Sequence, residues 1–138
     1  MKRLKDWRTR LHKAVEDRRR VPFSFEAGVD CALFVSDCIE AMTGEDPAAE
    51  FRGRYTTDIG ALRILRNEGH ATLADAVAAR LEEIHPSRAG VGDVAAVPTD
   101  SPFGWALGMF IGEQVIAQDL TGLATFSRDA AIRAFRVP

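Results

Sequence analysis

Residues 28–42 read Gly-Val-Asp-Cys-Ala-Leu-Phe-Val-Ser-Asp-Cys-Ile-Glu-Ala-Met, and this stretch decides the fold. Asp30 follows a glycine turn and predicts a helix N-cap, because its carboxylate can accept from the unpaired amides of the first turn. From Cys31 to about Met42, apolar residues cover most of the helix circumference. A helix of this kind lies inside a domain. Gly44 predicts the C-terminal cap of this buried helix.

Upstream of this helix, residues 1–20 form a basic arm. They hold nine basic and three acidic residues, a net charge of +6, whereas residues 21–138 carry −8. Apolar residues at helical spacing predict an amphipathic helix: Leu4, Trp7, Leu11 and Val15. The charge invites a nucleic-acid or phospholipid interpretation, but no aromatic residues alternate with the basic ones as in single-strand binders. We expect a docking or packing helix and no nucleic-acid binding.

Downstream, helices precede strands. One helix is predicted over Ile59–Asn67, capped by Asp58, and another from Thr72 to before Pro86, with Leu73, Val77, Leu81 and Ile84 on one face. Short β-prone runs punctuated by glycine then predict four strands: Val94–Val97, Ala106–Ile111, Gln114–Ala117 and Leu123–Phe126. Asp129–Phe135 is predicted as a short helix or turn. This order indicates an α+β fold, with N-terminal helices packed on a small antiparallel sheet.

Length and composition bound the class of protein. The 138 residues predict one domain over 1–138, with 1–20 as its N-terminal helix and 21–138 as its core. A content of 46% hydrophobic and 28% charged residues is typical of a globular protein with a real core. Two cysteines exclude a disulfide scaffold and a four-cysteine metal site, and we expect no metal and no cofactor. Neither a membrane span nor a secretory signal is visible, which predicts synthesis in the cytoplasm.

Three segments carry a family resemblance: Gly28–Phe34, Gly92–Val97 and Ala106–Gly112. Their order and spacing resemble the NlpC-type, papain-like cell-wall peptidases, from about Phe23 to Ala117. In that family the pattern is Asp-Cys-small-small-Phe/Leu, then Gly-Asp and an apolar run, then His-Val-Gly, three apolar residues and Gly. The resemblance implies a papain-like fold with Cys31 as the candidate nucleophile.

Two further motifs resemble a branch of this group that occurs in bacterial and phage genomes. They are Thr43-Gly44-x-Asp46-Pro47 and Arg52-Gly53-Arg54-Tyr55. Small proteins of this branch often lie among the tail genes of phages, prophages and gene-transfer particles. The resemblance therefore implies a tail-tip or tail-assembly role, with other phage-tail proteins as partners and the virion tail as the final location.

The chemistry implied by the resemblance lacks one component. A helix N-terminus lowers the pKa of a cysteine thiol, which suits Cys31 as a nucleophile, although a small apolar residue would occupy the same place in a buried helix. Cys38 lies two turns on, about 10 Å along the axis, and is expected in the core. Where the family has its catalytic histidine, this sequence has Ala106, which can neither accept nor return a proton.

The other candidate residues have structural alternatives. Of His12, His70 and His85, we expect each to be a solvated surface residue, with His85 the best candidate for a relocated base because it precedes the first predicted strand. Asp30 and Asp93 match the family pattern, yet each can also serve as a cap or turn residue. Trp105 could fill the space left by the missing imidazole or anchor the sheet.

The sequence thus predicts a catalytically silent relative of these peptidases that serves as a structural or assembly component of a phage-type tail. The alternative is a working cysteine peptidase or amidase on peptidoglycan stem peptides, with Cys31 as nucleophile and a base elsewhere. A third class, a nucleic-acid adaptor, would need salt-dependent binding that depends on the basic helix.

Overall fold

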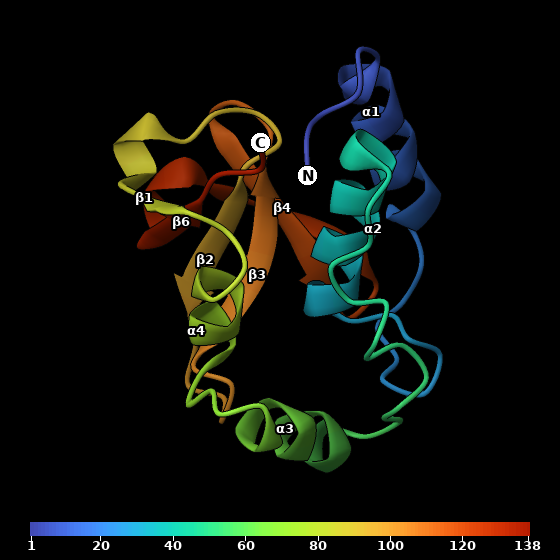
Figure 1. Cartoon of the computed structure of the whole chain (residues 1–138). Coiled ribbons are helices and arrows are strands. Elements are labelled where there is room, and N and C mark those ends of the chain that lie inside the picture. Colours follow the sequence, from blue (N-terminus) through green and yellow to red (C-terminus); the bar gives the residue numbers. More distant parts are fainter.

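The computed structural model describes all 138 residues as helices packed on a six-stranded antiparallel sheet (Figure 1). The helices are α1 (Trp7–Arg18), α2 (Cys31–Thr43), α3 (Asp58–Asn67) and α4 (Leu73–Ala78). The strands are β1 (Glu83–Ile84), β2 (Val94–Pro98), β3 (Trp105–Phe110), β4 (Gln114–Asp119), β5 (Gly122–Ser127) and β6 (Arg133–Phe135), in the order β1-β6-β2-β3-β4-β5. Two short 3₁₀ turns cover Pro86–Arg88 and Arg128–Ala130. The predicted α+β class is confirmed.

The helix α2 forms the centre of the core, as its sequence predicts. It packs between α1 and the sheet, where it contacts β3 and β4 (Figure 1). Phe34, Cys38 and Met42 on this helix are completely buried. Asp30 caps the N-terminus by accepting a hydrogen bond from the Leu33 amide at 2.9 Å, and Gly44 ends the helix with a left-handed φ of 82°.

The last predicted helix and the C-terminal segment are corrected by the structure. The helix that begins after Thr72 ends at Ala78, and Glu83–Ile84 form strand β1 instead of a fourth helical turn. The C-terminal segment has a 3₁₀ turn followed by β6, which lies between β1 and β2. Both errors have one cause: β1 and β6 pair with each other, and this long-range pairing overrides the local helical spacing.

The four predicted strands are confirmed as β2, β3, β4 and β5, with bounds that differ from the predicted ones by at most two residues. The cap of α3 is Thr57, one residue before the predicted Asp58. No helix of the structure has the length and apolar character that crossing a bilayer requires.

The helix α3 stands apart from the main layers. In Figure 1 it lies at the bottom of the molecule, in the connection between α2 and α4. Only Leu65 on this helix is buried, and Ile59 is 67% exposed. The apolar face of α3, which includes Ala61 and Ile64, lines a cavity that opens to the surface instead of packing against the core.

Candidate functional site

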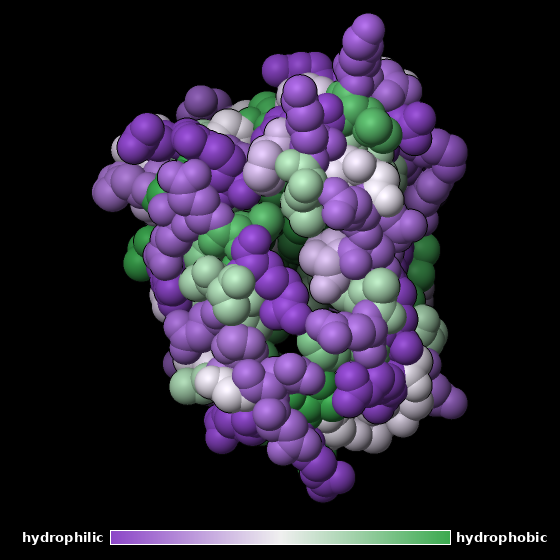
Figure 2. All heavy atoms as spheres, in the orientation of Figure 1, coloured by the Kyte–Doolittle hydropathy of each residue, from purple (hydrophilic) through white to green (hydrophobic).

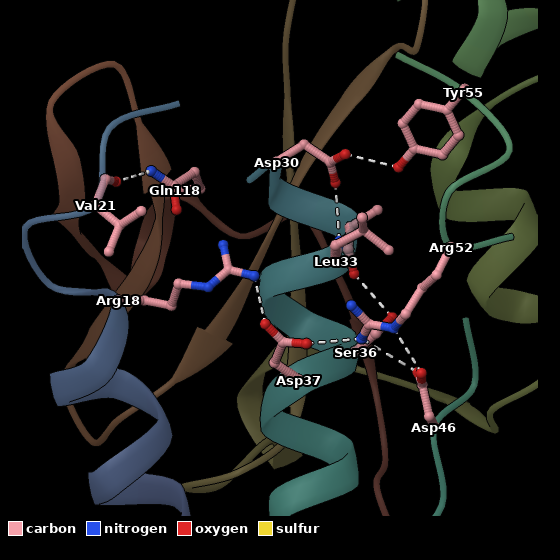
Figure 3. A network of polar contacts seen from close by, with 11 residues as sticks. Arg18, Val21, Asp30, Leu33, Ser36, Asp37, Asp46, Arg52, Tyr55 and Gln118 are labelled. Atoms are coloured by element: carbon pink, nitrogen blue, oxygen red, sulfur yellow. Dashed lines mark hydrogen bonds and ion pairs between the residues drawn. The ribbon is translucent and has the colours of Figure 1, made fainter. Parts of the chain in front are cut away.

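The N-terminus of α2 is the organising point of the candidate site. Asp30 is only 4% exposed, and its two carboxylate oxygens accept from different elements. Oδ1 accepts from the Leu33 amide at 2.9 Å, and Oδ2 accepts from the Tyr55 hydroxyl at 2.6 Å (Figure 3). Burial and the negative charge of Asp30 both raise the pKa of Tyr55, so this hydroxyl stays protonated and donates.

An ion-pair network holds the segment that carries Tyr55 against α2. Arg52 pairs through Nε with Asp46 at 2.6 Å and through Nη2 with Asp37 at 2.7 Å (Figure 3). Asp37 on α2 also pairs with Arg18 at the end of α1. The carboxylate of Asp37 therefore joins three parts of the chain: helix α1, helix α2 and the loop that precedes α3. This arrangement fixes where Tyr55 meets Asp30.

A cavity of about 460 Å³ opens beside this helix end. Its walls come from α2, α3, α4, the start of β3, Gln118 on β4 and the loops around residues 23–25, 48–55 and 99–103. Of the 25 residues that line it, 16 are hydrophobic, so the site is mostly apolar. Figure 2 shows this face of the molecule hollowed above α3, between α2 and α4. A cavity of this size falls in the range of small-molecule sites, about 300–1,000 Å³.

The surroundings of Cys31 make its thiol a poor nucleophile. Burial raises the pKa of Cys31 to about 11, and the negative charge of Asp30 acts in the same direction. Hydrogen bonding from backbone amides, of which that of Leu107 is the strongest, only partly offsets these effects. A helix N-terminus alone would lower the pKa of a cysteine thiol. Here the pKa of Cys31 is raised, because the apolar walls and the adjacent Asp30 carboxylate outweigh the effect of the helix N-terminus. Cys38 is buried in the core, as predicted.

Four of the five predicted site residues share this cavity. Asp30, Cys31, Trp105 and Ala106 all line it. Asp93 does not: it is 5% exposed and lies where the two ends of the chain meet. There it accepts from Arg3 at 3.0 Å, from the Val137 amide at 3.0 Å and from the Gly90 amide at 2.9 Å. Asp93 therefore holds the fold together.

Two of the three histidines are exposed as expected, and His70 differs from the expectation. His70 lines the same cavity as Cys31, whereas His12 and His85 are exposed. The side chain of His85 is used locally, where it accepts from the Ser87 amide at 3.1 Å. The spacing of His70 along the chain gave no signal, since it is the loop between α3 and α4 that brings it to the cavity.

The contact between Tyr55 and Asp30 in the cavity wall is not predicted by the sequence. Tyr55 was part of a motif that carried the resemblance, but its role needed a partner 25 residues away. No group of three or more His, Cys, Asp or Glu side chains in the structure is placed to hold a metal ion.

Residues 2–137 match the family model described as "Domain of unknown function (DUF6950)". The chain belongs to this family. No curated protein matches this DUF6950 chain. Among solved structures, it is similar to the NlpC/p60 domain of the peptidoglycan hydrolase SagA, with a TM-score of 0.52 and 18% identity over 94% of this chain and 95% of that one. The DUF6950 domain therefore has the NlpC-type, papain-like fold that its sequence motifs predict.

Proposed function

We propose that this DUF6950 domain is a non-catalytic relative of NlpC-type peptidases that works as a binding and assembly component. The observation that carries the proposal is Ala106, which lines the cavity beside Cys31 at the position where the resemblance expects a histidine. Without an imidazole there, that position offers no group to take the thiol proton or to protonate a leaving amine.

Two further observations support this proposal. The pKa of Cys31 at about 11 leaves the thiol protonated at neutral pH, whereas a nucleophile needs thiolate. The cavity lining also carries three acidic side chains, Asp30, Asp58 and Glu68, which repel the carboxyl groups of peptidoglycan stem peptides. A fold shared with a peptidoglycan hydrolase domain does not transfer its activity when the site differs.

The assembly partners we propose are other phage-tail proteins, on the strength of the sequence resemblance, with the virion tail as the location. An affinity-tagged chain expressed with its neighbouring genes tests this directly. We expect tail proteins to co-purify with it and the chain to appear in purified particles. Absence from particles that are complete in their other tail proteins would contradict the proposed role.

The test of catalytic silence uses peptidoglycan fragments. We expect the wild-type protein and Cys31→Ala to release no new amino groups from cross-linked or stem-peptide fragments, at any pH between 5 and 9. Release by the wild type that disappears in Cys31→Ala would overturn the proposal. A fold check by circular dichroism on both proteins ensures that inactivity reflects the site.

A second candidate function rests on one observation: His70 lines the cavity that contains Cys31. A cysteine hydrolase with its base on the loop between α3 and α4 would use this pair. His70→Gln and, as the control, the exposed His85→Gln separate the two functions. If His70 activates the thiol, His70→Gln slows alkylation of Cys31 at neutral pH and His85→Gln does not. Under the non-catalytic proposal neither variant changes the rate.

A further inference from the structure

Four aromatic rings form a cluster in the cavity wall. Phe25 lies at its centre, with ring centroids 4.7 Å from Phe23, 6.3 Å from Tyr55 and 6.3 Å from Phe103. All four residues line the cavity. The faces of aromatic rings carry negative electrostatic potential and attract cations. The cluster is therefore a surface suited to a positively charged group.

The protein's own cations do not use these rings. Guanidinium groups stack on five other aromatic rings: Trp7, Phe51, Trp105, Phe110 and Phe135. None stacks on the four rings of the cluster. Its faces are thus left for a cation that comes from outside the chain.

The charged groups of the cavity point to the same class of ligand. Asp30, Asp58 and Glu68 line it, and none of them forms an ion pair within the protein. The one lysine or arginine in the lining is Arg80, which is paired with Glu50 at 3.0 Å. The buried Asp30 is bonded to Tyr55, so a carboxylate lies at the edge of the aromatic cluster. The two donors that Asp30 already has, the Leu33 amide and the Tyr55 hydroxyl, are both neutral, so no cation accompanies this carboxylate within the chain.

The size and walls of the cavity narrow the ligand further. Helices and loops surround its volume of about 460 Å³ on several sides, which suits a small molecule better than a polymer chain. Inorganic divalent cations need several oxygen ligands, which the apolar walls do not supply. An organic cation satisfies both the rings and the carboxylates.

We propose that the cavity between α2, α3 and the aromatic cluster binds a small organic cation, an ammonium group carried on an apolar body. The ammonium lies against Phe25 and its neighbouring rings, on the side of Asp30, and the apolar body contacts the inner face of α3. This inference goes beyond the proposed function and does not depend on the reactivity of Cys31.

The experiment compares two probes of the same shape by titration calorimetry on the full chain. They are trimethyl(para-hydroxyphenyl)ammonium and para-tert-butylphenol, which differ in one atom, nitrogen or carbon, and in charge. We expect the cation to bind at least tenfold more tightly than its neutral counterpart. We expect added salt to weaken the binding of the cation and to leave the binding of the phenol nearly unchanged, because only the cation is attracted by charge. Equal binding of the two probes, or no binding of either, would overturn the proposal.

Two pairs of variants locate the site. Phe25→Leu removes the central ring, and we expect it to weaken the binding of the cation at least fivefold. The control, Phe126→Leu on the exposed part of β5, leaves the binding of the cation unchanged. Glu68→Gln on the cavity rim weakens the cation about two- to threefold, and the exposed Glu113→Gln does not. Glu68 is exposed and makes no contact in the core, so its variant remains informative if Phe25→Leu unfolds. Equal effects of each variant and its control would contradict this placement of the cation.

Failure of this proposal and failure of the proposed function remain distinguishable. Hydrolysis of peptidoglycan fragments reports on Cys31 alone, and calorimetry reports on the ligand alone. A protein that hydrolyses no peptidoglycan fragment and binds neither probe would overturn the proposed cation site, but it would agree with the proposed non-catalytic role.

Discussion

The Tyr55 hydroxyl donates a 2.6 Å hydrogen bond to Oδ2 of Asp30, whose Oδ1 caps the helix that carries Cys31. One buried carboxylate thus joins the loop before α3 to the start of α2. The same pair forms part of the cavity wall. The position of this loop, the first turn of the helix and the shape of the cavity therefore depend on each other.

Removal of the Tyr55 hydroxyl tests this dependence. Tyr55→Phe leaves the buried Oδ2 of Asp30 without its donor, and we expect the free energy of unfolding to fall by about 1–3 kcal/mol. Urea denaturation followed by circular dichroism measures the change. Ser101→Ala, which removes an exposed hydroxyl, serves as control and is expected to change stability little. A Tyr55→Phe protein as stable as wild type would show that this contact contributes nothing.

The alkylation rate of Cys31 reports its pKa. With a pKa of about 11, only about one thiol in ten thousand is thiolate at pH 7, because the pKa lies four units above the pH. We expect the rate with iodoacetamide, followed by mass spectrometry of the Cys31 peptide, to rise with pH through 9 without a plateau. Cys38 in the core reacts more slowly still. A plateau below pH 8 would indicate an activated nucleophile.

Ala106→His supplies the imidazole that the resemblance expects. Since residue 106 lines the cavity with Cys31, we expect the new side chain to stabilise the thiolate and to raise the alkylation rate at pH 7 at least tenfold. Thr125→His on exposed β5 adds the same residue away from the cavity. If both variants react like wild type, residue 106 lies too far from the thiol to act on it.

The Arg52 network predicts a dependence of stability on acid. Burial acts to raise the pKa of Asp46, but hydrogen bonds from Arg52 and from the Ala48 amide, together with the charge of Arg52, outweigh it and hold this pKa below its ordinary value. A lowered pKa in the folded state stabilises the protein above the unfolded-state pKa of about 4, and this stability is lost as the pH falls through the lower, folded value.

Arg52→Met removes the largest of the effects that lower the pKa of Asp46. We expect it to destabilise the protein by about 1–2 kcal/mol at pH 7, since the ion pairs are only partly exposed, and by less at pH 3. Urea titrations at the two pH values measure the difference. Arg10→Met removes an exposed ion pair between α1 and its N-cap residue Asp6, and controls for the lost charge. An equal loss at both pH values would contradict the assigned role of Asp46.

Gly108 on β3 has no room for a side chain. A Cβ there would lie 2.6 Å from the Ile116 carbonyl oxygen of β4. We expect Gly108→Ala to cost about 1–3 kcal/mol, because the two strands must move apart. Gly90→Ala adds the same methyl group where no atom lies within 4 Å, and we expect thermal unfolding to show little change there. Equal midpoints for the two variants would contradict the close approach.

The sequence predicts those parts of the fold that local chemistry determines. The apolar run from Cys31, its Asp30 cap and Gly44 specify α2 without reference to any other segment. Strands β2 to β5 follow from short β-prone runs punctuated by glycine. Strands β1 and β6 escaped prediction because each has three residues or fewer and depends on long-range pairing, β1 with β6 and β6 also with β2.

The candidate site likewise has some residues that the sequence predicts and others that it does not. Motif order placed Asp30, Cys31, Trp105 and Ala106 around one cavity, since helix and strand positions carry over within a fold. The direction in which the pKa of Cys31 is shifted could not be predicted, because the shift depends on apolar walls from segments far away in the chain. His70 and the aromatic cluster escaped prediction for the same reason.

The contacts of Arg3 hold the two ends of the chain together, which makes a circular permutation of the chain possible. The guanidinium of Arg3 binds the carbonyl oxygens of Val137 and Val91, and its backbone amide donates to Pro138 at 3.2 Å, so the two ends lie side by side (Figure 1). A short glycine linker could therefore join residues 138 and 1 into a circle. New ends opened in the loop around Gly53 would make α3 the first helix of the permuted chain, without a change to the buried core.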